Sequence, residues 1–229
     1  MRRTLATFAS LGALTLAAPG FAAGGSDEAG CTIERRREVA GIATYAAECH
    51  WPVAPRFVAA IVGDPQRIAA ASTSLVSSTR LADGRILNVH LAGWPIDDRQ
   101  STLAIKKTAL DDGGLLLSYK LAPVQAPLGR GRVQARRDDG RWEIRGGAGR
   151  GTGDGAGGGS GGGTRVLYET TYDAGGSLPV SLVQRTVRSS VAKSLAEIRA
   201  AAELLARSEA QRTGANQGAR TRTQADTGE

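Results

Sequence analysis

The chain has 229 residues, 4% aromatic residues and a formal net charge of +7. This length is enough for one domain of ordinary size with tails. A basic chain raises nucleic acid as a partner, but the arginines are spread over predicted strand and helix faces without interleaved aromatic residues. We therefore expect no nucleic-acid binding, and we consider an anionic membrane surface the more natural partner.

The first residues have the composition of a secretory signal. Arg2 and Arg3 precede an apolar run over 5–18, and a Pro-Gly breaker and small residues follow it. The run is too short for a comfortable membrane span. We predict a cleaved signal peptide over 1–22 and a polar leader over 23–30, hence a periplasmic or secreted protein. An uncleaved anchor is the alternative, and the arginine pair leaves Sec and twin-arginine export open.

The two cysteines lie in the first predicted hairpin. Strands are expected over 32–38 and 42–50, with Ala40-Gly41 as the turn between them. Pairing of these strands would allow a disulfide between Cys31 and Cys49, as an oxidising compartment favours. Two unpaired thiols are the equally weighted alternative. Two histidines and two cysteines without ligand spacing predict no metal site.

Two short helices and a long meander follow. The helices are predicted over 55–62 and 65–71, since each opens on a proline and Gly63-Asp64 separates them. Alternation and turn residues then predict strands over 74–81, 85–93, 101–110, 115–121, 130–137 and 142–145. Asp138-Asp-Gly140 is expected as a turn between the last two.

Alternation within two of these strands assigns their faces. In the second strand of the meander, Leu87, Val89 and Leu91 are expected to point inward and Asn88 and His90 outward. In the fourth, the inward residues are expected to be Leu115, Leu117, Tyr119 and Leu121.

The glycine-rich stretch over 146–163 is predicted to be a flexible insertion. A phosphate-binding loop would need a strand before it, a helix after it and usually a Lys-Ser or Lys-Thr pair, whereas here a strand follows. That strand, over 164–173, places Tyr168 on its apolar face. Residues 208–229 hold almost no large apolar residue and are predicted to be a disordered tail.

A long amphipathic helix is predicted from Pro179 to Arg207, after a glycine turn at 174–177. Apolar residues recur along it every three or four positions, as one stripe of an α-helix requires: Val183, Val187, Val191, Leu195, Ile198, Ala202 and Leu205. An antiparallel sheet with one apolar face can cover this stripe by curling around it. We therefore predict an α+β helix-grip fold, a curled antiparallel sheet wrapped around a long C-terminal helix, with two short helices after the first strands.

Four segments of this domain, 31–207, resemble the START lipid-transfer family within the helix-grip (SRPBCC, polyketide-cyclase-like) superfamily. Gly41-Ile-Ala-Thr-Tyr45 is similar to the family's early "G-I-x-V-Y" strand. Leu91-Ala-Gly-Trp-Pro-Ile-Asp-Asp-Arg99 is similar to its "W-P-x-x-x-R-D" loop. The segment from Gly163 to Pro179 resembles "G-T-x-V-x-Y-x-x-x-x-D-P-G-G-x-L-P", and Ala196-Glu-Ile-Arg199 lies where the family has "L-x-x-L-R".

The resemblance implies an internal pocket for a lipid, sterol or other hydrophobic ligand, in a monomer without a cofactor. The expected pocket residues combine the inward positions with the family's gating loop: Leu87, Val89, Leu91, Trp94, Arg99, Leu117, Tyr119, Tyr168, Leu182, Val183 and Val187. The same residues could instead fill a solid core. Arg99 is expected to pair with Asp98 or, as the less favoured option, to meet an anionic headgroup.

Catalytic chemistry finds little support in the sequence. His50 and His90 lie on separate predicted strands with no nucleophile motif nearby. We expect a non-catalytic binding protein that carries its ligand between membranes. The alternatives are a cyclase- or aromatase-like enzyme on the same fold, with His90 and Tyr119 as its test positions, and a pocketless envelope interaction protein.

Overall fold

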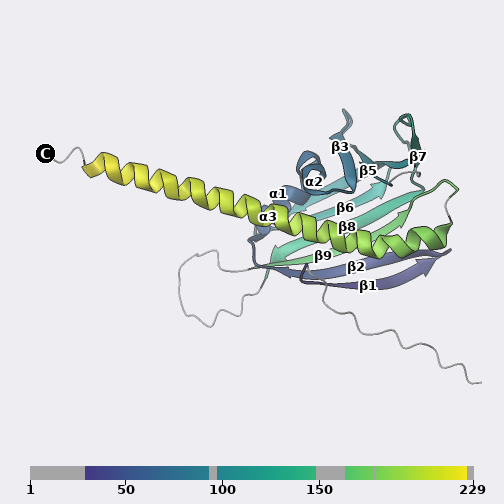
Figure 1. Ribbon diagram of the computed structural model, residues 1–229, viewed down its shortest axis with the longest axis horizontal. Helices are drawn as coiled ribbons and strands as arrows, with labels where there is room; N and C mark the ends of the chain where they lie inside the picture. The colour runs from purple at the N-terminus through teal and green to yellow at the C-terminus, as the bar shows by residue number, and fades with distance from the viewer. Residues whose placement is uncertain (1–28, 93–96, 148–162, 178, 226–229) are drawn as a thin grey trace, which may run out of the picture.

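A curled sheet packs along the N-terminal part of one long helix in the computed structural model of the chain, and the C-terminal part of that helix projects beyond the sheet (Figure 1). The structure describes residues 29–92, 97–147, 163–177 and 179–225. Within the last helix, side chains are described at 183 and 186–213 only. Trp94 therefore lies outside the described residues, as do the predicted signal peptide and most of the glycine-rich stretch.

The sheet has nine strands in the order β1-β2-β9-β8-β6-β5-β4-β3, and β7 pairs with β5 off this path. All neighbours are antiparallel except β5 and β7. The strands are β1 (Cys31–Val39), β2 (Ile42–Trp51), β3 (Leu75–Arg80), β4 (Ile86–His90), β5 (Asp98–Ala109), β6 (Leu115–Leu121), β7 (Arg132–Gln134), β8 (Arg137–Gly146) and β9 (Thr164–Asp173). The helices are α1 (Pro55–Val62), α2 (Pro65–Ala71) and α3 (Val180–Ala225). The predicted helix-grip architecture is confirmed.

Local chemistry fixes the two short helices at their predicted bounds. Each starts with a proline, which needs no hydrogen-bond partner for its nitrogen in the first turn. The Asp64 carboxylate caps α2 by accepting hydrogen bonds from the backbone N–H groups of Gln66 (2.8 Å) and Arg67 (3.2 Å).

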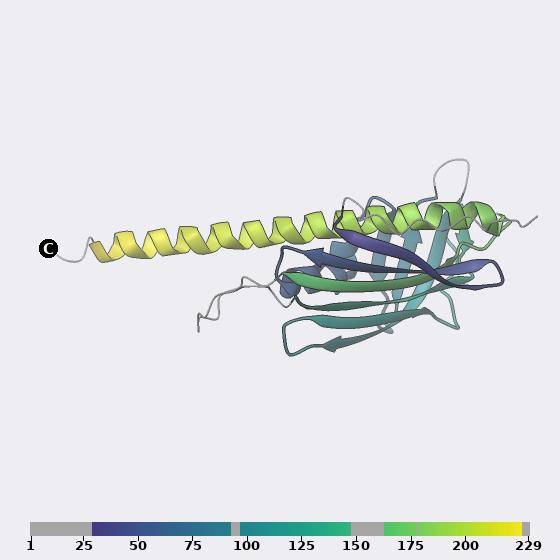
Figure 2. The same cartoon turned by 90° about the horizontal axis from the view of Figure 1, so that it is seen from below.

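Helix α3 lies along the concave side of the sheet (Figure 2). Its predicted stripe is the buried one: Leu195 and Ala202 are fully buried, and Ile198 is 2% exposed. The stripe packs into the core that the sheet, α1 and α3 share. Burial of large apolar side chains stabilises the fold by roughly 1.5–3 kcal/mol each, so this stripe fixes the rotation of α3 about its own axis.

The helix also continues beyond its predicted end. The backbone over 208–225 is helical, so the prediction of a disordered tail is wrong for this segment. Its alanine, arginine and glutamine residues favour a helix, and extension of an existing helix requires no new nucleus. Few apolar residues limit the packing of a helix but do not prevent its formation.

The predicted turn at Asp138-Asp-Gly140 is wrong, because these residues lie within β8. The Asp139 carboxylate accepts a hydrogen bond from the Leu121 N–H at 3.1 Å, so it is used inside the sheet. Gly140 is needed for close packing, since a Cβ there would lie 2.4 Å from the Tyr119 hydroxyl.

Strand β5 is buried on both faces over 99–103. Arg99 and Leu103 face the concave side, whereas Gln100 and Thr102, both fully buried, face the outer side under the segment 122–135. The Gln100 amide donates hydrogen bonds to the carbonyls of Ala126 and Pro127 at 3.3 and 3.0 Å. β7 also pairs with β5 at its first residues.

The first hairpin carries a disulfide. Cys31 and Cys49 are cross-strand partners in β1 and β2, and their sulfur atoms are bonded. Both are buried in the core beside Trp51, whose indole N–H donates to the Ala29 carbonyl at 3.0 Å. Of the two alternatives left open by the sequence, the structure has the bridged one.

Candidate ligand-binding site

A cavity of about 800 Å³ lies between the concave face of the sheet, the inner face of α3 and the helices α1 and α2. Sites for single small molecules have volumes of about 300–1,000 Å³. The predicted alternative of a solid core therefore does not describe this fold.

Most of the predicted pocket residues that the structure describes line this cavity. They are Leu91, Arg99, Leu117, Tyr119, Tyr168, Val183 and Val187. Two predicted residues do not line it, Leu87 and Val89. Leu182 is in α3, but its side chain lies outside the described residues, as does all of Trp94.

The error at Leu87 and Val89 comes from the face assigned to β4. Ile86, Asn88 and His90 line the cavity. Val89 is buried on the opposite face, where its cross-strand partner is Gln100 under the segment 122–135. The prediction took the apolar side of the strand as the inner one. That rule fails here because the outer face is also covered and the inner face meets a cavity with a polar end.

The prediction also missed several apolar lining residues. They are Leu103 and Ile105 of β5, Trp142 of β8, and Val191 and Ile198 of α3. Alternation in β5 and the predicted helical stripe carried the signal for four of them. Trp142 was predicted to lie in a strand, but that strand was predicted too short, over 142–145, and no face was assigned to it.

Aromatic and apolar groups form one part of the cavity. The rings of Trp142 and Tyr168 lie 4.1 Å apart between centroids, on neighbouring strands, with Leu117 opposite Trp142 in the next strand pair. Such surfaces favour hydrocarbon because burying apolar area releases water from both sides.

Three hydroxyls meet in the middle of the cavity wall. The Tyr119 hydroxyl lies 3.2 Å from the Tyr168 hydroxyl and donates to the Thr170 hydroxyl at 3.2 Å. Burial disfavours the phenolate, so it raises the pKa of Tyr119 well above its usual value and also raises the pKa of Tyr168. Both phenols are therefore neutral hydrogen-bonding groups at neutral pH.

These tyrosines predict a loss of stability in alkaline solution. Above about pH 10 the unfolded chain releases its tyrosine protons, while folded Tyr119, Tyr168 and Tyr172, whose pKa is also raised by burial, keep them. The folded state then binds more protons, so the free energy of unfolding falls by up to about 1.4 kcal/mol per pH unit for each tyrosine. Urea unfolding between about pH 8 and pH 11 measures this decline. Tyr119→Phe should make it shallower, and an unchanged slope would contradict the assignment.

Polar groups gather at the end of the cavity formed by β4, the start of β5, the start of β8 and the end of β9. Asn88, His90, Arg99, Asp138 and Tyr172 all line it there. The Asp138 carboxylate accepts a hydrogen bond from the Ser101 hydroxyl at 2.6 Å, and its Oδ2 lies 3.7 Å from His90 Nε2. The His90 and Tyr172 rings lie 5.8 Å apart between centroids. The cavity thus has a polar end and an apolar end.

The predicted Arg99–Asp98 pair is not formed. Neighbours along a strand point to opposite faces; Arg99 lines the cavity, whereas Asp98 accepts a hydrogen bond from the Ala92 N–H at 3.3 Å. Sequence adjacency was a poor guide because β5 extends back to Asp98, earlier than its predicted start.

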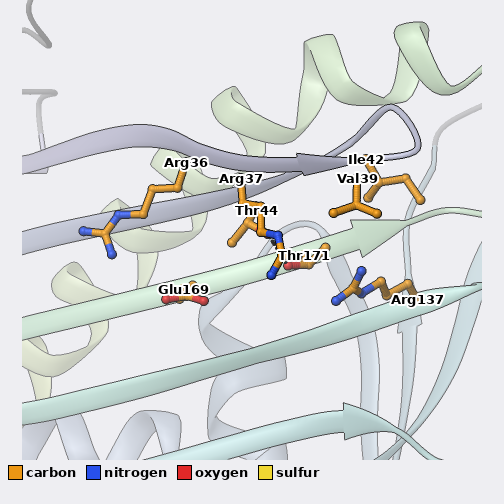
Figure 3. Close-up of a pocket in the computed structure, with 8 residues that line it drawn as sticks. All are labelled: Arg36, Arg37, Val39, Ile42, Thr44, Arg137, Glu169 and Thr171. Carbon is orange, nitrogen blue, oxygen red and sulfur yellow. Dashed lines mark hydrogen bonds between the residues drawn. The ribbon is translucent and has the colours of Figure 1, made fainter.

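A second hollow, of about 410 Å³, lies on the outer face of the sheet (Figure 3). Three of its eight lining residues are arginines and one is a glutamate. The lining residues are Arg36, Arg37, Val39, Ile42, Thr44, Arg137, Glu169 and Thr171. Arg36 and Arg37 are exposed, and Arg37 has no ion-pair partner within the ranges that the structure describes. The hollow is a basic surface of two neighbouring hairpin strands and the strands beside them.

Metal ligation and membrane spanning have no candidates in the described part of the chain. No group of three or more histidine, cysteine, aspartate or glutamate side chains there is arranged to hold a metal ion. No helix among the same residues has the length and hydropathy needed to cross a membrane.

The chain resembles known proteins in its fold but not in its sequence. No family model and no curated protein sequence matches the chain. The described architecture is the helix-grip fold, and similar solved structures indicate which kind of helix-grip protein it resembles.

The solved structures with a similar fold include STAR-related lipid transfer proteins. A STAR-related lipid transfer protein from Xanthomonas axonopodis is 20% identical with a TM-score of 0.61, covering 78% of this chain and 97% of that one. The lipid transfer and protein localization domain of human StarD13 is 15% identical with a TM-score of 0.61, covering 78% and 87%. Human STARD10 is 12% identical with a TM-score of 0.59, covering 76% and 69%. The chain therefore has the START fold.

Proposed function

We propose that the protein binds a lipid, sterol or other hydrophobic small molecule in the cavity and carries it as a monomer between membranes. The observation that carries this proposal is the cavity between sheet and helix, with Leu103, Leu117 and Val187 among its apolar lining. Solved lipid-transfer proteins of the same fold support it.

The cavity chemistry favours binding over turnover. A tyrosine whose pKa is raised by burial releases its proton less readily, which makes Tyr119 a poor general acid at neutral pH. Its hydroxyl is engaged with Tyr168 and Thr170, as suits a group that orients a ligand. We therefore propose a non-catalytic protein in preference to a cyclase-like enzyme.

Mass spectrometry of protein purified under native conditions tests the proposal. We expect a bound lipid, or a mass shift when lipids or sterols are added to stripped protein. Protein that is free of ligand and shows no shift with any of them would overturn the proposal. Turnover of a polyketide-like substrate that is lost in His90→Ala or Tyr119→Phe would support the enzyme instead.

We propose export to the periplasm or the medium as the setting for this activity. The disulfide of the first hairpin supports it, because such bonds persist in oxidising compartments. N-terminal sequencing of the mature protein should give a start near residue 23. Recovery of the intact N-terminus from the cytoplasm would argue against export.

The basic outer hollow supports contact with an anionic membrane. Each arginine near such a surface contributes about 1 kcal/mol of attraction. Arg36→Glu/Arg37→Glu should weaken binding to phosphatidylserine-containing vesicles by at least about tenfold in co-sedimentation. Arg188→Glu/Lys193→Glu, on the exposed side of α3, makes the same change of charge elsewhere and serves as the control. Equal losses in both variants would show that only net charge matters.

A further inference from the structure

Three buried polar atoms at one end of the cavity have no hydrogen-bond partner among the described residues. They are Asn88 Oδ1, His90 Nε2 and Arg99 Nε. Buried polar groups in folded proteins are nearly always satisfied, so such groups in one place require an explanation. All three residues line the same cavity, and His90 and Arg99 are cross-strand partners in β4 and β5.

Arg99 is the decisive member of this group. Arg99 is 5% exposed, and no carboxylate in the described segments lies within 4.0 Å of its guanidinium. One guanidinium nitrogen, Nη1, donates to the carbonyl of Asp97, whereas Nε has no hydrogen-bond partner among the described residues. Arginine stays charged in proteins, so a cation is held in a desolvated place without a counter-ion from the described chain.

The nearby carboxylate does not fill this role. Asp138 is bonded to the Ser101 hydroxyl and faces His90 Nε2. It is the cross-strand partner of Tyr172 in β8 and β9, a further polar group of this end. Asp138 thus belongs to a network of its own beside Arg99.

We propose that this end of the cavity recognises the anionic headgroup of an amphiphile, a carboxylate or a phosphate, through Arg99. The inference rests on the proposed function, since it names the class of ligand that the same cavity takes. The guanidinium supplies a charged donor to the anionic oxygen, the strongest class of hydrogen bond available here. Asn88 Oδ1 is an acceptor for a hydroxyl or N–H beside the headgroup.

The rest of the cavity sets the orientation of such a ligand. From the headgroup end, the wall passes through the hydroxyls of Tyr119 and Thr170 to the rings of Trp142 and Tyr168. The tail therefore points toward Trp142 and Leu117, where hydrocarbon gains most from burial.

Ligands that share one tail and differ in headgroup test this inference. Palmitate, hexadecyl phosphate, palmityl alcohol and hexadecyl trimethylammonium are titrated into stripped protein, with binding measured by native mass spectrometry and calorimetry. We expect the two anions to bind roughly ten- to hundredfold more tightly than the alcohol, as charge-assisted hydrogen bonds predict. The acid and the phosphate together distinguish which anion is preferred.

Arg99→Gln should remove the advantage of the anions over the alcohol. Lys106→Gln, an exposed position of the same strand, is the matched control and should keep the advantage. Should Arg99→Gln fail to fold, the wild-type comparison of acid with alcohol still decides. Equal binding of acid and alcohol would overturn this inference while the proposed function stands. Absence of binding by all four probes would also overturn this inference, and the proposed function falls only if added sterols and other lipids give no mass shift either.

Discussion

Ser194→Trp is expected to weaken ligand binding strongly while the fold is kept. Ser194 lies on α3 between Val191 and Ile198 and lines the cavity, so an indole ring at this position occupies the space of the ligand. Cavity filling commonly stabilises a protein by about 0.5–2 kcal/mol, and we expect an unchanged or slightly raised free energy of unfolding. The affinity for lipid should fall by more than about tenfold. A ligand in such a pocket buries most of its surface, so the indole ring removes contacts that the ligand needs.

Lys193→Trp is the matched control for this variant. Lys193 precedes Ser194 on the same helix but is exposed, so the same ring points into solvent. We expect Lys193→Trp to bind ligand as the wild type does. Unimpaired binding by Ser194→Trp, with its thermal unfolding still cooperative, would show that the ligand lies elsewhere.

Removal of the Cys31–Cys49 disulfide should produce the largest loss of stability. The bond closes a loop with a sequence separation of 18, which is worth about 3 kcal/mol in the chain-entropy model. Both residues are buried, so Cys31→Ala/Cys49→Ala is preferable to serine substitutions. For a chain of this size, the expected shift in Tm is about −6 to −12 °C.

Treatment with a reductant distinguishes the effect of the disulfide bond on stability from the effect of replacing the cysteine side chains. Wild-type protein unfolded and refolded in dithiothreitol should approach the stability of the double-alanine variant. That variant should not respond to dithiothreitol. A wild-type protein whose free energy of unfolding is the same with and without reductant would contradict a stabilising bond.

The predictable parts of this fold were those set by local chemistry. Proline and Asp64 fixed the short helices, and the stripe from Val187 to Ala202 fixed the buried face of α3. Alternation in β6 and β9 correctly placed Leu117, Tyr119 and Tyr168 on the inner face. These are positions where one face of an element is apolar and the other is wet, so the pattern has one interpretation.

The errors occurred where that contrast is absent. The β4 alternation was misassigned because both of its faces are covered, and β8 was split because its aspartates are bonded inside the sheet. Arg99 could not be recognised as an unpaired cation, since its surroundings come from strands far apart in the sequence. A local sequence pattern cannot predict which residues from distant strands will surround one side chain.

The covered outer face of β5 has a consequence for ligand selection. Arg99 faces the cavity, but its neighbour Gln100 is bonded to the segment 122–135 on the other side, and β7 pairs with both. The backbone at these positions is held from both sides, which fixes the point from which the Arg99 side chain enters the cavity. Residues that do not line the cavity, Gln100 among them, thus help to set the position of Arg99.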